Sequence, residues 1–153
     1  TGLIKYLDTE SDLAGVLGHE IAHADRRHST AQLTKLYGVE ILSAVAVGSS
    51  GGALTELAKN LVSLKFSRSH ESDADYHSVK YLCPTSYNAD GAAGFFQKLV
   101  NNKQTGGTPE FLSTHPSPNN RVKDIKSTKI EMNCKGSRSN ASEYKKFKAA
   151  LPK

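Results

Sequence analysis

The stretch LAGVLGHEIAH, residues 13–23, decides how the rest of the chain is interpreted. Thr9 or Ser11 can cap a helix at its start, because acidic residues in the opening turn stabilise the free backbone amides there. Apolar residues then recur at helical spacing, which predicts a helix ending near His28. Its expected inward face consists of Leu13, Val16, Leu17, Ile21 and Ala24.

Two histidines in this stretch have the spacing of metal ligands. His19 and His23 lie about one helical turn apart, so both imidazoles project from one face and can bind one ion. Zinc accepts such nitrogens, and a catalytic zinc site keeps one position for water. Glu20 stands beside them, where it can take a proton from that water and later pass it to the leaving amine. The alternative is a pair of surface histidines that flank a glutamate.

A third protein ligand must come from elsewhere in the chain. The candidates are His28, His70, Glu71, Asp73, Asp75, His77 and His115. His28 would lie five residues beyond His23 on the same helix and would point away from the metal. Glu71 and Asp75 are one turn apart on the face that carries Ala74. A different face carries His70, Asp73 and His77, which could be solvated or could form an adventitious metal site, so helical geometry alone leaves the choice open.

The remaining pattern predicts further helices. We expect the second to be broken by the Gly/Ser run at residues 48–52, with Leu33, Leu36, Tyr37, Ile41, Ala44 and Val45 facing inward. A third helical stretch should run from Ala53 to Leu82 with a bend at Phe66–Ser67, and Pro84 should end it. Asn88 can cap a fourth, with core positions Ala92, Phe95, Phe96, Leu99 and Val100.

The last third of the chain predicts a loop at residues 101–109, a short helix around residues 121–125 and another at 139–150. No strand, repeat or second domain is expected. The predicted fold class is therefore mainly α, with residues 1–153 forming a single domain and residues 131–153 a basic tail or helix packed on it.

Composition limits the function classes. The chain has 153 residues, of which 37% are hydrophobic and 23% charged, as in an ordinary globular protein, and no apolar run approaches the roughly 20 residues of a membrane span. The net charge of +5 is concentrated in the last thirty residues. A nucleic-acid binder could use such a tail, but no DNA or RNA motif is present, so no nucleic-acid partner is expected. The two cysteines, Cys83 and Cys134, favour one disulfide and an oxidising compartment over two free thiols.

Three segments together resemble the HtpX-like and CAAX prenyl protease family of zinc metalloendopeptidases. They are LAGVLGHEIAH at residues 13–23, FSRSHESDAD at 66–75 and STHPSPNNRV at 113–122. Their order and rough spacing are also similar to that family, over at least residues 1–126. The resemblance implies a zincin-like (gluzincin) fold, an α+β fold in that family, whose strands we expect to lie upstream of Thr1.

The resemblance also implies roles for particular residues. Glu71 would be the third zinc ligand beside His19 and His23, and Asp75 would orient a ligating histidine. His115 would donate to the oxyanion formed during attack on the peptide carbonyl, and Arg121 would hold local carboxylates in place.

The sequence thus predicts a zinc endopeptidase that hydrolyses internal bonds of a protein or peptide, with one Zn²⁺ per chain and a role in protein quality control. We expect a location in the cell envelope, periplasmic or associated with the membrane through segments outside this chain. The alternative is a zinc-binding, chaperone-like module with weak proteolysis.

Overall fold

The computed structural model describes residues 2–48, 65–104, 111–115 and 120–152. Among these residues the chain is helical and has no strand, although Tyr87 and Arg138 form an isolated parallel bridge. The mainly α prediction is confirmed for this part of the chain. The helices are α1 (Gly2–Tyr6), α2 (Glu10–Asp25), α3 (His28–Ala46), α5 (Arg68–Leu82), α6 (Gly91–Gln104), α7 (Phe111–Thr114), α8 (Arg121–Glu131) and α9 (Ala141–Ala149).

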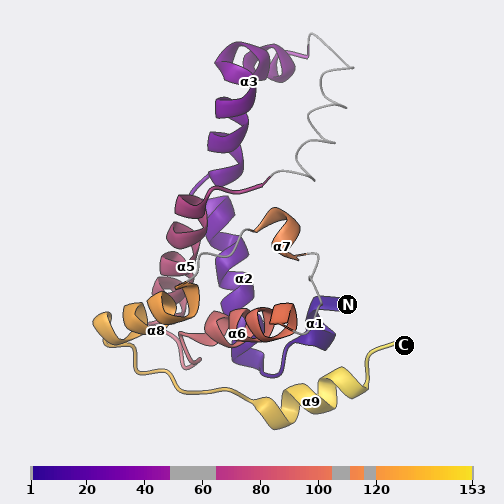
Figure 1. Ribbon diagram of the computed structural model, residues 1–153, viewed down its shortest axis with the longest axis vertical. Coiled ribbons are helices and arrows are strands. Elements are labelled where there is room, and N and C mark those ends of the chain that lie inside the picture. The colour runs from indigo at the N-terminus through magenta and orange to yellow at the C-terminus, as the bar shows by residue number, and fades with distance from the viewer. Residues whose placement is uncertain (1, 49–64, 105–110, 116–119, 153) are drawn as a thin grey trace.

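Helix α2 runs through the middle of the molecule (Figure 1). Helices α5 and α6 pack against it, and α8 packs on both α5 and α6. Helix α3 projects away from this body beyond the end of α2. The core between the packed helices includes Leu7, Val16, Val79, Phe95, Phe96, Leu99 and Ile125.

Both ends of α2 follow from local sequence. Thr9, one of the two predicted caps, caps the start: its side chain accepts from the Asp12 amide, and the Asp12 carboxylate accepts from the Thr9 amide, each at 3.0 Å. The helix ends at Asp25, three residues before the predicted end. Arg27 then adopts a left-handed conformation (φ 56°), which turns the chain so that His28 begins a new helix.

The predicted inward face of α2 is wrong at three positions. Leu17 and Ile21 are 49% and 58% exposed, and Ala24 is also exposed. The buried face instead consists of Ser11, Gly15, Val16, Gly18, His19, Ala22 and His23. Small residues face inward because α5 and α6 approach closely: a Cβ added at Gly15 would overlap the backbone of Gly91 and Ala92. Hydrophobic periodicity misses such a face, since glycine contributes nothing to it.

Helix α3 departs from its predicted face at Leu36. Leu33 is buried, but Leu36 is largely exposed, because this helix extends beyond the body of the molecule. Gly38 has positive φ (72°) and kinks the helix. The predicted inward positions Ile41, Ala44 and Val45 lie outside the described side chains, as do residues 49–52 of the predicted break.

Helix α5 matches the second part of the helix predicted over residues 53–82. Residues 65–67 are non-helical, so the expected bend is a full break, and Ser67 caps α5 by accepting from the His70 amide at 3.1 Å. Residues 53–64 of that predicted helix lie outside the described residues. Helix α5 ends at Leu82, as Pro84 requires.

Helix α6 differs from its prediction at both ends. It begins at Gly91 rather than next to Asn88, whose side chain instead accepts a hydrogen bond from Lys129. Four of the five predicted core residues are buried, whereas Val100 is exposed. The helix continues to Gln104, so the predicted loop starts later, and its residues 105–109 are not described.

Two long-range connections fix the C-terminal part. Cys83, after α5, and Cys134, after α8, form the predicted disulfide. Tyr144 of α9 is buried in the core, and its hydroxyl donates to the Ile4 carbonyl at 2.9 Å. No helix among the described residues is long and apolar enough to cross a membrane.

Candidate metal centre and active site

Helix α2 presents both histidines of the first motif on its buried side. His19 and His23 are almost fully buried, and their Nε2 atoms lie 3.0 Å apart, as the one-turn spacing requires. Glu20 follows His19 directly, and its side chain is 43% exposed. The helix therefore combines two buried nitrogen donors with a neighbouring carboxylate that solvent can reach.

Helix α5 supplies two carboxylates to the same place. Glu71 is fully buried, with Oε2 3.4 Å from His19 Nε2 and Oε1 3.4 Å from His23 Nε2. Asp75, one turn later, has Oδ1 2.9 Å from the other nitrogen of His19, Nδ1. An Nδ1–H donated to this carboxylate leaves the Nε2 lone pair of His19 facing Glu71.

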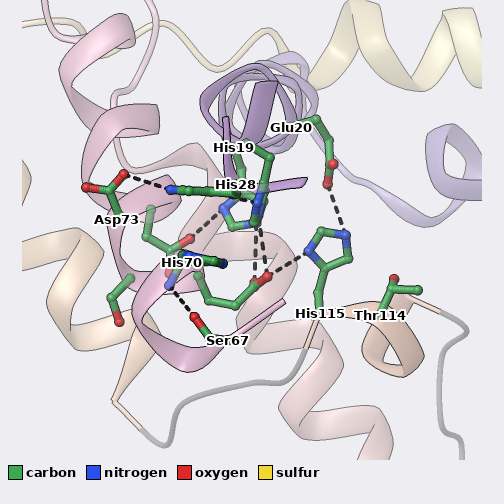
Figure 2. Close-up of polar contacts among 12 residues, drawn as sticks. His19, Glu20, His28, Ser67, His70, Asp73, Thr114 and His115 are labelled. Atoms are coloured by element: carbon green, nitrogen blue, oxygen red, sulfur yellow. Dashed lines mark hydrogen bonds and ion pairs between the residues drawn. The ribbon is translucent and has the colours of Figure 1, made fainter. Parts of the chain in front are cut away.

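His115, just after α7, completes the group from a third direction. Figure 2 shows its ring below Glu20, with a dashed line between the two side chains. Its Nδ1 is 3.0 Å from Glu71 Oε1, and its Nε2 is 3.7 Å from Glu20 Oε1. The ring stacks on Phe111 with centroids 4.2 Å apart, which holds it in this orientation.

Arg121, the first residue of α8, is buried among these carboxylates. Its Nε and Nη2 lie 2.6 and 2.8 Å from the two oxygens of Asp75, a bidentate pair. Nη2 is also 2.9 Å from Glu71 Oε2 and 3.1 Å from both ring nitrogens of His19. The guanidinium stacks over the Phe96 ring at 3.5 Å. Arg121 thus joins α8 to the carboxylates of α5.

Burial and hydrogen bonding act in opposite directions on these groups. Burial alone would raise the pKa of Glu71, but its polar contacts with His115, His19 and His23 and the charge of Arg121 hold that pKa well below its usual range. Burial alone would lower the pKa of His19, but hydrogen bonds to Asp75 and Glu71 raise it. Burial lowers the pKa of His23, with hydrogen bonding to Glu71 acting in the other direction. Glu71 is therefore a carboxylate at neutral pH.

The donor atoms fit a metal ion. One ligand atom from each of His19, His23, Glu71 and His115 can be chosen so that all lie within 4.8 Å of one another. Tetrahedral zinc with bonds of about 2.0–2.1 Å keeps neighbouring donors about 3.3 Å apart. The two Nε2 atoms lie 3.0 Å apart, and each lies 3.4 Å from one of the two Glu71 oxygens, separations close to that spacing. Glu71 Oε2 also lacks a well-aligned hydrogen-bond partner among the described residues, as a ligand oxygen would, despite its ion pair with Arg121.

Sequence reasoning misplaced one residue near the site. His28 does not continue the helix of His23; it begins α3, and its Nδ1 lies 3.1 Å from His23 Nδ1. It therefore faces back toward His23, although it is not among the four converging donors. Its Nε2 is 3.1 Å from Asp73, and its ring stacks on His70. Sequence alone gave little indication of this contact. The contact depends on the left-handed conformation of Arg27, which the sequence does not specify.

Comparison with known proteins agrees with the site. A model of peptidase family M48 matches residues 1–129. The beta-barrel assembly-enhancing protease of Yersinia pestis is 29% identical over 148 residues, which cover 86% of this chain and 30% of that protein. Metalloprotease YcaL of Escherichia coli K12 is 29% identical over 133 residues, covering 82% of this chain and 52% of YcaL. Mitochondrial metalloendopeptidase OMA1 of Arabidopsis thaliana is 33% identical over 126 residues, covering 80% of this chain and 25% of OMA1.

This chain spans less than a third of the length of the Yersinia relative. The narrower resemblance to HtpX-like and CAAX prenyl proteases stays a prediction. The family match, in contrast, extends over most of the chain and includes all three segments quoted from the sequence. On this ground the chain belongs to peptidase family M48.

Proposed function

We propose that the chain is the catalytic part of a zinc-dependent endopeptidase that hydrolyses internal peptide bonds of protein substrates. The observation that supports this most is the convergence of His19 and His23 from α2 with Glu71 from α5. Glu20 follows His19 directly in the same helical turn. The family makes proteolysis the expected chemistry, and the donor set is one that zinc prefers.

In this proposal His19, His23 and Glu71 hold the ion. Bound zinc lowers the pKa of a water molecule and polarises a carbonyl oxygen. Asp75 fixes the proton of His19 on Nδ1, and Arg121 holds Asp75 in place through two hydrogen bonds. These contacts keep the Nε2 lone pair of His19 directed inward and the Glu71 carboxylate ionised.

Glu20 is the proposed general base and acid. It takes a proton from the attacking water and then gives it to the nitrogen of the leaving amine. Its exposed position suits this role, because a substrate must reach it from solvent. His115, whose Nε2 lies near Glu20, is the proposed donor to the oxygen that becomes negatively charged during attack.

The cellular setting follows from two further observations. The Cys83–Cys134 disulfide favours an oxidising compartment. The names of the relatives point to beta-barrel assembly and to mitochondria. We therefore propose a location in the cell envelope, periplasmic or membrane-associated, and a role in protein quality control with envelope proteins as substrates.

The test is metal analysis combined with digestion of casein, with and without a chelator. We expect one zinc per chain, proteolysis that the chelator abolishes, and recovery when zinc is restored. Glu20→Gln should keep the zinc and lower kcat by about 10²–10⁴-fold, the usual contribution of a general base, whereas Glu71→Ala should lose most of the metal.

Unchanged activity of Glu20→Gln would overturn the base assignment, and full zinc content in Glu71→Ala would overturn the ligand assignment. A wild-type chain that binds zinc and unfolded protein without cutting it would favour the chaperone-like alternative.

A further inference from the structure

A chain of polar contacts lies behind His23, at the ring edge opposite to the proposed metal. His23 Nδ1 is 3.1 Å from His28 Nδ1, and His28 Nε2 is 3.1 Å from Asp73 Oδ2. The His28 side chain is almost fully buried, and its ring stacks in parallel on His70 with centroids 4.5 Å apart. Figure 2 shows the Asp73–His28 contact on the side of the site away from His115. His28, Asp73 and His70 have no part in the chemistry proposed above.

Only one direction of hydrogen bonding is consistent with metal binding. The Asp73 carboxylate can only accept, so a neutral His28 that bonds to it carries its proton on Nε2. His28 Nδ1 is then an acceptor, and His23 must donate to it from Nδ1. The lone pair of His23 is thereby left on Nε2, which faces His19 and Glu71. The opposite direction would place the proton of His23 on the atom that must bind the metal.

We propose that His28 and Asp73 are positioning residues that fix the tautomer and ring orientation of His23 for zinc binding. The inference rests on the proposed zinc site and adds two residues to its support. Both ligating histidines would then be oriented by an aspartate of α5: His19 directly by Asp75, and His23 by Asp73 through His28.

The helical geometry explains why one aspartate needs an intermediary. Glu71 and Asp75 are one turn apart and face the interior, whereas Asp73 lies at the flank, where its side chain is 34% exposed. Its carboxylate contacts His28 rather than His23. The turn at Arg27 brings the start of α3 into this space, so the His28 ring connects the flank of α5 to the buried histidine.

A second metal site is a weaker interpretation of the same residues. The rings of His28 and His70 are nearly parallel, at 9°, so they stack rather than direct their nitrogens to a common point. In the described part of the chain, the one group of converging metal donors is His19, His23, Glu71 and His115. The His28–Asp73 pair therefore acts on the first site instead of forming another.

The experiment measures zinc affinity by competition with a chelating dye. His28→Leu should weaken zinc binding by about 10–100-fold, the usual effect of removing a residue that orients a ligand. His28→Gln should retain most of the affinity, because its amide oxygen can accept from His23 while its amide nitrogen donates to Asp73. Asp73→Ala should weaken binding in the wild-type background and have no further effect in His28→Leu.

Arg26→Gln is the matched control. Arg26 Nε also lies 3.1 Å from Asp73 Oδ2, but its side chain has no hydrogen bond to His28 or His23 among the described contacts, so its loss should leave zinc affinity unchanged. Metal-free unfolding curves of each variant separate a loss of affinity from a loss of fold. If His28→Leu does not fold, Asp73→Ala, changed at a partly exposed position, still tests the proposal.

A spectroscopic measurement gives a second readout. In the zinc-loaded protein, nitrogen-15 spectra should show His28 protonated at Nε2 and unprotonated at Nδ1. Wild-type zinc affinity in His28→Leu, equal weakening by His28→Gln and His28→Leu, or a proton on His28 Nδ1 would each overturn the relay while leaving the zinc site intact. A wild-type chain that binds no zinc would instead remove the proposed function, and the relay with it.

Discussion

At the scale of single residues, the site is a concentration of buried charge that the protein stabilises by mutual contact. Glu71 and Asp75 are buried and would each be strongly unfavourable alone. Arg121 neutralises part of this charge, and a divalent cation held by His19, His23 and Glu71 would neutralise more. Removing any one of these groups leaves others uncompensated, so the site should lose metal and stability together when a ligand is replaced.

His115 is the residue whose role a single substitution decides. If it donates to the oxyanion, His115→Ala should keep its zinc and lower kcat by about 10²–10³-fold, the effect of removing one such donor. Ser113→Ala, two residues away at an exposed position, should leave kcat unchanged. Steady-state kinetics together with zinc content check this. Loss of zinc would show instead that His115 is a metal ligand, which its place among the four converging donors would permit.

At the scale of elements, the position of the site depends on how closely α2 meets its neighbours. Gly15 and Gly18 face α6 and α5, and Ala22 follows on the same side. Ser78 of α5 donates to the Gly15 carbonyl at 2.8 Å across this contact. Because the helices touch nearly backbone to backbone, the side chains of His19 and Glu71 reach each other.

Gly15→Ala should therefore destabilise the protein. The added methyl would meet the backbone of Gly91 and Ala92, which cannot rotate away, so the helices would have to separate. Overpacking of this kind typically costs about 1–3 kcal/mol, and backbone contact places this case at the upper end or beyond. Denaturant unfolding of the metal-free protein measures the change.

Gly2→Ala is the control for this prediction, since a Cβ there would meet nothing within 4 Å. Its stability should stay within about 1 kcal/mol of the wild type. Equal stabilities of the two variants would mean that the contact between α2 and α6 is looser than the structure indicates.

At the scale of the whole molecule, the disulfide connects the ends of α5 and α8, two helices that contribute side chains to the site. Cys83 follows α5, which carries Glu71 and Asp75, and Cys134 follows α8, which carries Arg121. The bridge thus limits the separation of α5 from α8 and closes a chain segment that would otherwise move freely in the unfolded state.

Replacing both cysteines by serine should lower the free energy of unfolding. For a sequence separation of 51 residues, the loop-closure model gives about 4 kcal/mol. Chemical denaturation with and without a reductant measures it: the wild type should lose stability on reduction, and the double variant should not respond. A wild type that is equally stable in both conditions would contradict this role for the bridge.

The sequence by itself determined the helices and the chemistry of the donors. Local sequence predicts a cap at Thr9 or Ser11, a stop before Pro84 and the one-turn spacing of His19 and His23, because each depends on contacts within a few residues. The choice of Glu71 needed the resemblance to known proteases, because spacing along one helix does not say which side chain meets another helix.

Tertiary structure alone decided which faces are buried and which residues meet. Leu17 and Ile21 are apolar yet exposed, since glycine and alanine give the closer helix packing on the other face. The contact of His28 with His23 depends on one left-handed residue, and the convergence of Glu71, His115 and Arg121 on one point depends on the packing of α5, α7 and α8. This convergence consists of long-range contacts, whose geometry arises when the helices pack and is not encoded in any local pattern.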